Sequence, residues 1–442
     1  MNEVLIAIFV LGYAAIAFEH PLKINKAAPA IITGVLCWTV YALFGGVDHI
    51  TVEHQLLEFF SEVASILFFL LAAMTIVELI DVHHGFSVIT DRVQTTSKVK
   101  LLWIISWLAF FFSAGLDNLT SSIVMVSLLR KLIADKNERL FYAGIVIIAA
   151  NAGGAWSPIG DVTTTMLWIG GQITAANIIK TLILPSIVCL LVPLIYLTFT
   201  MKGNVERPAV REDLSKLKTI TNKEKSIVFV VGVLGLIFVP IFKTVTHLPP
   251  FMGMLLSLGV LWVLTELMHK RKSVELRDSL SVVGVIRKVD TTSVLFFLGI
   301  LVAIGSLQAT GILNELAAFM DRTIPNENVV VMTIGLLSSI VDNVPLVAAG
   351  MGMYPMPPIN PADVIEGVKY YPQDDHFWEF LAYCAGTGGS ALIIGSAAGV
   401  AVMGMEKMDF FWYMKKMSLL AIIGYFSGAV TFLLTYSFFG LN

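Results

Sequence analysis

The sequence contains few charged residues, few cysteines and almost no long polar stretch. Asp, Glu, Lys and Arg make up only 14% of its 442 residues, whereas hydrophobic residues make up 57%, above the roughly half that soluble domains contain. A net charge of −3 gives no electrostatic basis for binding nucleic acid. The mean hydropathy of +0.82 and the recurring apolar runs instead indicate a membrane protein.

The three cysteines carry no sign of redox or metal chemistry. Cys37, Cys189 and Cys384 all lie within apolar runs, where a thiol is more often a small buried hydrophobe than half of a disulfide or a zinc ligand. The first residues also lack the basic leader that is typical of a signal peptide, so we expect residues 2–18 to form a retained first helix.

Apolar runs of about 20 residues, the length that crosses a bilayer, recur along the whole chain. In a first half, residues 1–201, we expect elements at 2–18, 28–45, 62–80, 99–133, 139–170 and 174–201. In a second half, residues 226–442, we expect elements at 226–245, 250–268, 293–318, 328–353, 378–405 and 410–440. A charged linker, residues 202–225, separates the halves, and the two sets correspond element by element.

An Asp-Asn pair lies in the middle of the fourth element of each half and follows a serine at the same spacing. The two copies are Ser113, Asp117 and Asn118, and Ser338, Asp342 and Asn343. Each pair divides its run into arms too short to cross separately, so we expect two re-entrant hairpins with the pair at the tip. Each half then has five crossings, an odd number, and the second half is inverted relative to the first, as in secondary transporters.

The distribution of Lys and Arg fits one orientation, because these residues gather on the cytoplasmic side. If the N-terminus lies outside, the inner segments are near 19–27, 81–100, 130–139, 202–225, 269–290 and 406–416. These segments contain 25 of the 29 basic residues. We therefore expect both termini outside the cytoplasm, with the first hairpin entering from the inside and the second from the outside.

A second repeated pattern follows each hairpin. NAGGAWSPIGD, residues 151–161, and GTGGSALIIGS, residues 386–396, share a glycine pair and an Ile-Gly at one constant offset. Glycine pairs, and Pro158 in the first copy, weaken a helix, so we expect a broken helix in each half. Unwound backbone at membrane depth is tolerated where it is buried in protein or lines a watery cavity. Small residues packed between helices are an alternative explanation of the glycines.

Carbonyl, hydroxyl, amide and carboxylate oxygens are suitable ligands for a hard cation, and both patterns supply them. The predicted cation site combines a first-half set with its second-half counterpart. The set comprises Ser113, Asp117, Asn118, Thr120, Asn151, Ser157, Asp161, Thr163 and Thr164, and Ser338, Asp342, Asn343, Thr387, Ser390 and Ser396.

These motifs together resemble the NhaD-type sodium/proton antiporters of the ion transporter superfamily, which also includes arsenite permeases and divalent-anion/sodium symporters. The resemblance covers almost the whole chain, through FEHPLKINKAAPA, GLDNLTSS, SPIGDVTTTMLW, VDNVPL and GTGGSALIIGSAAG. It implies an all-α polytopic fold with a scaffold and a transport domain, in a bacterial inner membrane. It also implies export of sodium or lithium driven by proton entry, without a cofactor. A homodimer is expected by fold analogy only.

Acidic hairpin tips favour a cation over an anion, since anion-transporting relatives typically have neutral Ser-Asn-Thr tips. No Lys or Arg lies within the motifs that contain Asp117, Asp161 and Asp342. Desolvation raises the pKa of a buried carboxylate and a bound cation lowers it, so sodium and a proton compete for one site. Competition at an alternating-access site produces antiport.

Several alternatives remain open. Each Asp could simply cap the helix that follows it, although a cap can also bind an ion. Within the same fold, the chain could be a sodium-coupled carboxylate symporter or an arsenite permease. An intramembrane aspartyl protease requires two facing aspartates, but PIGD at residues 158–161 lacks the first glycine of its Gly-x-Gly-Asp motif. A passive channel is disfavoured by the repeated broken helices.

Overall fold

The computed structural model describes residues 1–208, 220–270, 272–324, 326–358, 360, 364 and 368–439. Over these ranges the regular structure is helical, and the β-type pairing is an isolated bridge between Ser97 and Asn204. Within the described residues, eight helices are long and apolar enough to cross a membrane. The predicted class, an all-α polytopic membrane protein, is confirmed.

Each half of the chain consists of helices of unequal length. The first half contains α1 (Asn2–Ala17), α2 (Glu19–Leu22), α3 (Ala27–Phe44), α4 (His49–Val82), α5 (Ser87–Thr90), α6 (Lys98–Gly115), α7 (Asn118–Leu132), α8 (Lys136–Ala155), α9 (Val162–Ile169) and α10 (Ala175–Thr200). The second half contains α12 (Asn222–Thr246), α13 (Pro250–His269), α14 (Val274–Leu280), α15 (Val282–Ile286), α16 (Thr291–Ala309), α17 (Ile312–Thr323), α18 (Glu327–Leu337), α19 (Asn343–Met353), α20 (His376–Gly388), α21 (Ala397–Glu406), α22 (Phe410–Lys416) and α23 (Ser418–Phe439). Residues 209–219 of the predicted linker lie outside the described residues.

Three predicted elements differ from the helices of the structure: one begins earlier than predicted, and two are each divided into two helices. α4 begins at His49 rather than at residue 62, because Asp48 caps it through the Thr51 N–H (2.9 Å) and its first turns are too polar to register as an apolar run. The run predicted at 293–318 is two helices, α16 and α17, which are separated where Gly311 adopts a φ of +75°. The run predicted at 410–440 is likewise divided into α22 and α23 at Met417.

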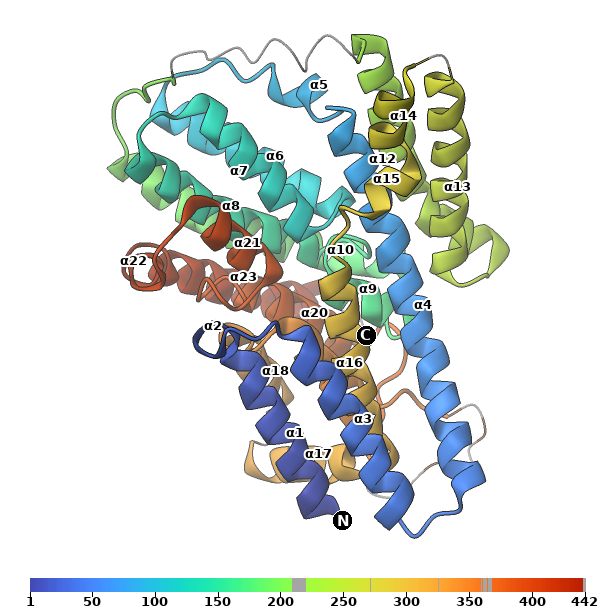
Figure 1. Cartoon of the computed structure of the whole chain (residues 1–442). Coiled ribbons are helices and arrows are strands. Elements are labelled where there is room, and N and C mark those ends of the chain that lie inside the picture. The colour runs from blue at the N-terminus through green and yellow to red at the C-terminus, as the bar shows by residue number, and fades with distance from the viewer. Residues whose placement is uncertain are drawn as a thin grey trace.

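The helices pack in two groups, which Figure 1 shows side by side. In the flanking group, α3 packs against α1 and α16, and α4 packs against α12, α13 and α16. In the hairpin group, α6, α7, α10, α20 and α21 surround α8, while α18 and α23 pack against α20. The groups meet mainly where α16 contacts α19 and where α4 contacts α9.

The glycines of the repeated pattern are needed for close packing rather than for breaking a helix. α8 continues through Gly153 and Gly154 to Ala155. A Cβ on Gly153 would lie 2.1 Å from the carbonyl oxygen of Phe110 in α6, and a Cβ on Gly388 would lie 1.9 Å from that of Gly335 in α18. Each glycine therefore allows the first arm of a hairpin to lie directly against the helix that follows it. The packing alternative for these glycines is correct. The first break comes after its glycine pair, whereas in the second copy α20 ends at Gly388 and Gly389 is its C-cap.

Candidate functional site

The first hairpin, α6 and α7, turns at Leu116 and Asp117. Asp117 is the N-cap of α7, and its carboxylate accepts hydrogen bonds from the N–H (2.7 Å) and the hydroxyl (2.8 Å) of Thr120. Its φ is +144°, a region that residues other than glycine rarely occupy and that persists only where the surrounding structure imposes it. The hydrogen bonds of Asp117 are therefore those of a helix cap, as the capping alternative expects.

Asp117 also faces a small cavity between the two helix groups. The cavity has a volume of about 50 Å³ and is lined by Asp117 and Asn118 of the hairpin tip, by Phe69 of α4 and by Ser293 and Phe297 of α16. One buried water requires roughly 10–15 Å³ of such volume. The space at this tip is therefore large enough for water or a small cation.

Asp161 lies at the centre of the site and is 2% exposed. It is the N-cap of α9, and its Oδ1 accepts hydrogen bonds from the N–H (2.9 Å) and the hydroxyl (2.7 Å) of Thr163. The amide of Asn118 donates to its Oδ2 (2.6 Å), and the amide of Asn343 lies 3.4 Å from its Oδ1. The two hairpin tips therefore meet at one buried carboxylate.

Asn151 connects the two broken helices. Its side chain is fully buried, and its Oδ1 accepts a hydrogen bond from the Asn118 amide (3.1 Å). Its Nδ2 donates to the hydroxyls of Ser390 (2.9 Å) and Ser396 (3.0 Å). Predicted site residues from both halves thus form one continuous buried network.

Four helix N-termini begin in or beside this network. Asp117, Asp161, Asp342 and Ser396 are the side-chain caps of α7, α9, α19 and α21. A helix N-terminus carries roughly half a positive charge, which stabilises the ionised form of each capping aspartate. The cap at Ser396 occupies the position that corresponds to Asp161 in the second half, but it has no charge.

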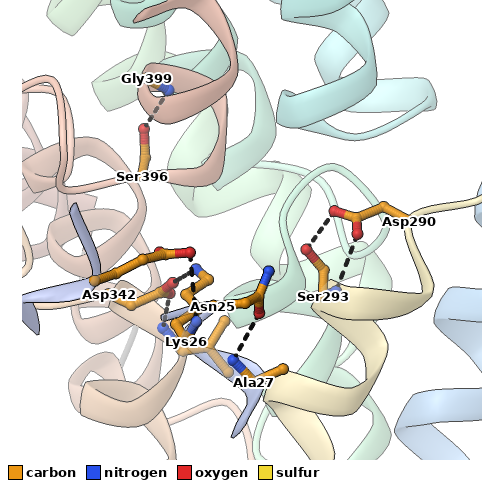
Figure 2. A network of polar contacts seen from close by, with 10 residues as sticks. Asn25, Lys26, Ala27, Asp290, Ser293, Asp342, Ser396 and Gly399 are labelled. Carbon is orange, nitrogen blue, oxygen red and sulfur yellow. Dashed lines mark hydrogen bonds and ion pairs between the residues drawn. The ribbon is translucent and has the colours of Figure 1, made fainter. Parts of the chain in front are cut away.

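Asp342, at the second tip, has a cationic partner that lies outside the predicted set of site residues. Its Oδ1 accepts the Val344 N–H (3.3 Å), and its Oδ2 accepts the ammonium of Lys26 (3.0 Å), as Figure 2 shows. Lys26 was assigned to a basic inner loop, and its pairing with Asp342 could not be predicted from that assignment. The carboxylates of Asp117 and Asp161 make no such ion pair with any described residue.

Among the described residues, the remaining predicted hydroxyls form no hydrogen bond with Asp161. Ser113 donates to the Ala150 carbonyl (2.6 Å), Ser157 to Ala114 (2.5 Å), Ser338 to Ala385 (3.0 Å) as well as to Gly335 of its own helix (2.7 Å), and Thr387 to Tyr383 (2.6 Å). Short hydroxyl side chains readily bond nearby backbone carbonyls. The first three of these bonds fasten each hairpin to its broken helix, and the bond of Thr387 lies within α20. The hydroxyl of Thr164 is buried and has no partner among the described residues.

Two buried acids, Glu379 and Glu406, were missed by the sequence analysis. Glu379 in α20 is fully buried; the Asn177 amide of α10 donates to one of its oxygens, and the other has no described partner. The signal was a single acid in the apolar run HFWEFLAYCAG. An acid in such a run is normally functional or paired, which is the reasoning that singled out Asp117.

The sequence matches the citrate transporter family, CitMHS, over residues 13–365. The chain belongs to this family. It is 48% identical to sodium/proton antiporter 1 of Arabidopsis thaliana, in an alignment that covers 96% of this chain and 71% of the relative. It is 44% identical to sodium/proton antiporter 2 of the same plant, over 98% and 99% of the two chains. It is 29% identical to the Na(+)/H(+) antiporter NhaD of Vibrio cholerae, over 90% and 84%.

The fold of this family member is similar to that of a solved transporter. The YdaH transporter of Alcanivorax borkumensis superposes with a TM-score of 0.60 at 11% sequence identity, over 94% of this chain and 99% of that chain. At that identity the likeness concerns the fold alone. The predicted resemblance to NhaD-type antiporters is confirmed, and the chain is a multi-pass membrane transporter rather than an enzyme. The aspartyl protease alternative is therefore wrong.

Proposed function

We propose that this transporter exchanges sodium or lithium for protons, and that the two kinds of cation compete for the carboxylate of Asp161. The observation that carries the proposal is the convergence of Asn118, Asn343 and Thr163 on this one carboxylate, which is 2% exposed. A buried carboxylate is costly when it is ionised and unpaired. Either a proton or a small cation relieves that cost, and each excludes the other.

The amide side chains can serve both states of such a site. Asn118 and Asn343 present N–H groups to Asp161, an arrangement that suits an ionised carboxylate without a metal ion. Each amide carries an oxygen on the opposite side, so rotation of the amide replaces a donor with a sodium ligand. Sodium and lithium are hard cations that accept amide, hydroxyl and carboxylate oxygens, the ligand type that hard cations prefer.

The charges of the site favour a cation over a carboxylate substrate. Asp117, Asp161 and Asp342 gather around the network, and among the described residues Lys26 alone forms an ion pair with one of them. Citrate carries several negative charges and would require additional cations beside these aspartates. Although the family is described as citrate transporters, the acidic tips and the relatives named sodium/proton antiporters support the antiport proposal.

The packing of the helices is compatible with alternating access. The flanking group would act as the scaffold and the hairpin group as the moving transport domain, with residues 1–201 and 226–442 as inverted repeats and the hairpins re-entrant. The basic residues support a cytoplasmic location for residues 202–225, and thus both termini outside. A bacterial inner membrane and a homodimer remain parts of the proposal by analogy.

Transport by the purified protein in proteoliposomes tests this proposal. Sodium or lithium added outside vesicles that hold an acidic interior should release the trapped protons, and choline should not. Citrate, succinate and arsenite should neither move nor stimulate sodium movement. Sodium flux that requires a dicarboxylate would support the symporter alternative, and arsenite flux would support the permease alternative; either result would refute the proposal.

A further inference from the structure

The pairing of Lys26 with Asp342 is a contact between the two helix groups. Lys26 immediately precedes α3, which packs against α1 and α16 in the flanking group. Asp342 caps α19, which packs against α9 and α20 in the hairpin group. Their charged atoms lie 3.0 Å apart, and the two side chains are only 25% and 16% exposed. The pair is therefore partly shielded from water and is sensitive to any relative movement of the groups.

The ammonium of Lys26 is held in position by its surroundings. The Asn25 side chain accepts the N–H of Ala27 (2.9 Å), and Glu19 accepts the backbone N–H of Lys26 (3.3 Å), so the chain before α3 is fixed at two points. The ammonium also lies 4.2 Å from the centre of the Phe296 ring in α16, where a cation interacts favourably with the ring face. Figure 2 shows this lysine directed at the second tip.

The two hairpin tips differ in how they satisfy their aspartates. Thr120 donates both its N–H and its hydroxyl to Asp117. At the corresponding position of the second tip stands Pro345, which has neither a backbone N–H nor a hydroxyl. Asp342 thus lacks the two donors that Thr120 gives Asp117. It accepts the Val344 N–H at 3.3 Å, and the ammonium of Lys26 provides a further, charged hydrogen bond.

We propose that Lys26 is an internal competitor of the transported cation, because its ammonium occupies Asp342 in the empty transporter and is displaced when a transported cation enters the site that Asp342 and Asp161 share through Asn343. The inference rests on the proposed function. Movement of the hairpin group away from α3 breaks the Lys26 contact and leaves Asp342 ionised in a partly buried position. Such movement is then favourable only when sodium or a proton replaces the ammonium. Lys26 is in this sense a positioning residue. It lowers the affinity of the site for the transported cation, and it keeps the hairpin group of the empty transporter against α3.

Charge removal at Lys26 tests this role. Lys26→Gln keeps a hydrogen-bond donor for Asp342 and deletes the positive charge, and Lys26→Met deletes both. An adjacent opposite charge changes the proton affinity of a carboxylate by about one to three powers of ten, and we expect a similar effect on sodium. At alkaline pH, where protons compete little, both variants should therefore lower the apparent sodium KM about tenfold or more. Tighter binding also slows release, and the maximal rate should fall with the KM. Lys26→Arg, which keeps the charge, should retain near-normal values.

Two comparisons separate this effect from a general disturbance. Lys23→Gln removes the same charge from an exposed position three residues earlier and should leave the sodium KM unchanged. In an Asp342→Asn background, Lys26→Gln should cause no further change in sodium binding, because the ammonium then has no carboxylate for which to compete. Sodium-dependent thermal stabilisation of the purified protein measures this binding without requiring transport. Monodisperse elution of each purified variant establishes that it is folded.

Failure of the proposed function and failure of the Lys26 inference give different experimental results. Absence of sodium-driven proton flux from the wild-type protein would refute the proposed function itself. With an active wild type, an unchanged or raised sodium KM in both Lys26→Gln and Lys26→Met would overturn the role of Lys26. An equal strengthening of sodium binding by Lys26→Gln in the Asp342→Asn background would overturn it as well.

Discussion

Replacement of Glu406 by Gln should destabilise the protein much more than most single changes at a membrane face. Glu406 is the last residue of α21, and its side chain is 1% exposed. Its two oxygens accept hydrogen bonds from Arg130 (2.7 Å) at the end of α7 and from Arg139 (2.8 Å) in the first turns of α8. One carboxylate thus joins the second broken helix to the first hairpin and the first broken helix.

The expected loss in the free energy of unfolding depends on how exposed Arg130 and Arg139 are. A hydrogen bond to a charged group contributes about 1.5–3 kcal/mol, and Gln keeps one acceptor oxygen but places an amide N–H against the other arginine. Arg130, whose side chain is 46% exposed, recovers water when its bond is lost, whereas Arg139, at 18%, recovers less. We therefore expect Glu406→Gln to cost about 2 kcal/mol, which is less than the roughly 3–5 kcal/mol for breaking a fully buried pair, because the more exposed arginine regains water.

Thermal unfolding in detergent measures this loss. Cys37, Cys189 and Cys384 are buried, so a thiol-reactive fluorophore should report their exposure as the protein unfolds. The matched control is Glu266→Gln, since Glu266 pairs with Arg277 at 3.0 Å but the two side chains are 35% and 51% exposed. Exposed pairs contribute about 0–1 kcal/mol. Equal shifts of the unfolding midpoint in the two variants would refute the reasoning that burial makes the ion pairs of Glu406 more stabilising than the exposed pair of Glu266.

Further changes test the ion site and the topology. Asp161→Asn should abolish sodium-dependent proton flux, because an amide can ligate sodium but cannot exchange it for a proton. Asp117→Asn should also lose flux, whereas wild-type flux would leave Asp117 as a cap only, since Asn caps a helix as well as Asp. Ser396→Ala removes one hydroxyl bonded to Asn151 and should mainly raise the apparent sodium KM. In a cysteine-free background, Asn204→Cys should react with an impermeant thiol reagent from the cytoplasmic side only and Gln373→Cys from the outside only; labelling of both from one side would refute the inverted-repeat proposal.

The sequence was sufficient to predict the main elements of the fold. Hydrophobic run length and the repeated Asp-Asn pair predicted two helix pairs that turn at Asp117 and Asp342, and the structure has both. Pattern reasoning was less reliable where a helix extends past its apolar part, as in α4 from His49. It was also less reliable at Gly311, since the φ of one residue decides whether α16 and α17 are one helix.

The site could be predicted only in part, because the sequence identifies polar residues but not their directions. The motifs contain Asn118, Asn151 and Asp161, which the structure brings into one network. They also contain Ser113, whose hydroxyl bonds a backbone carbonyl instead. Lys26 could not be identified, because its contact spans 316 positions in the sequence and depends on how α3 packs beside the second hairpin.

The dependence of the apparent sodium KM on pH tests the competition of sodium and protons most directly. Initial rates of sodium-driven proton flux should be measured in proteoliposomes over a range of sodium concentrations at several pH values. Competition at Asp161 predicts a KM that rises about tenfold for each unit of falling pH once the proton-bound form dominates, while the maximal rate at saturating sodium stays nearly constant. A KM that is independent of pH, with a maximal rate that falls instead, would show that protons act at another site and would contradict the central claim.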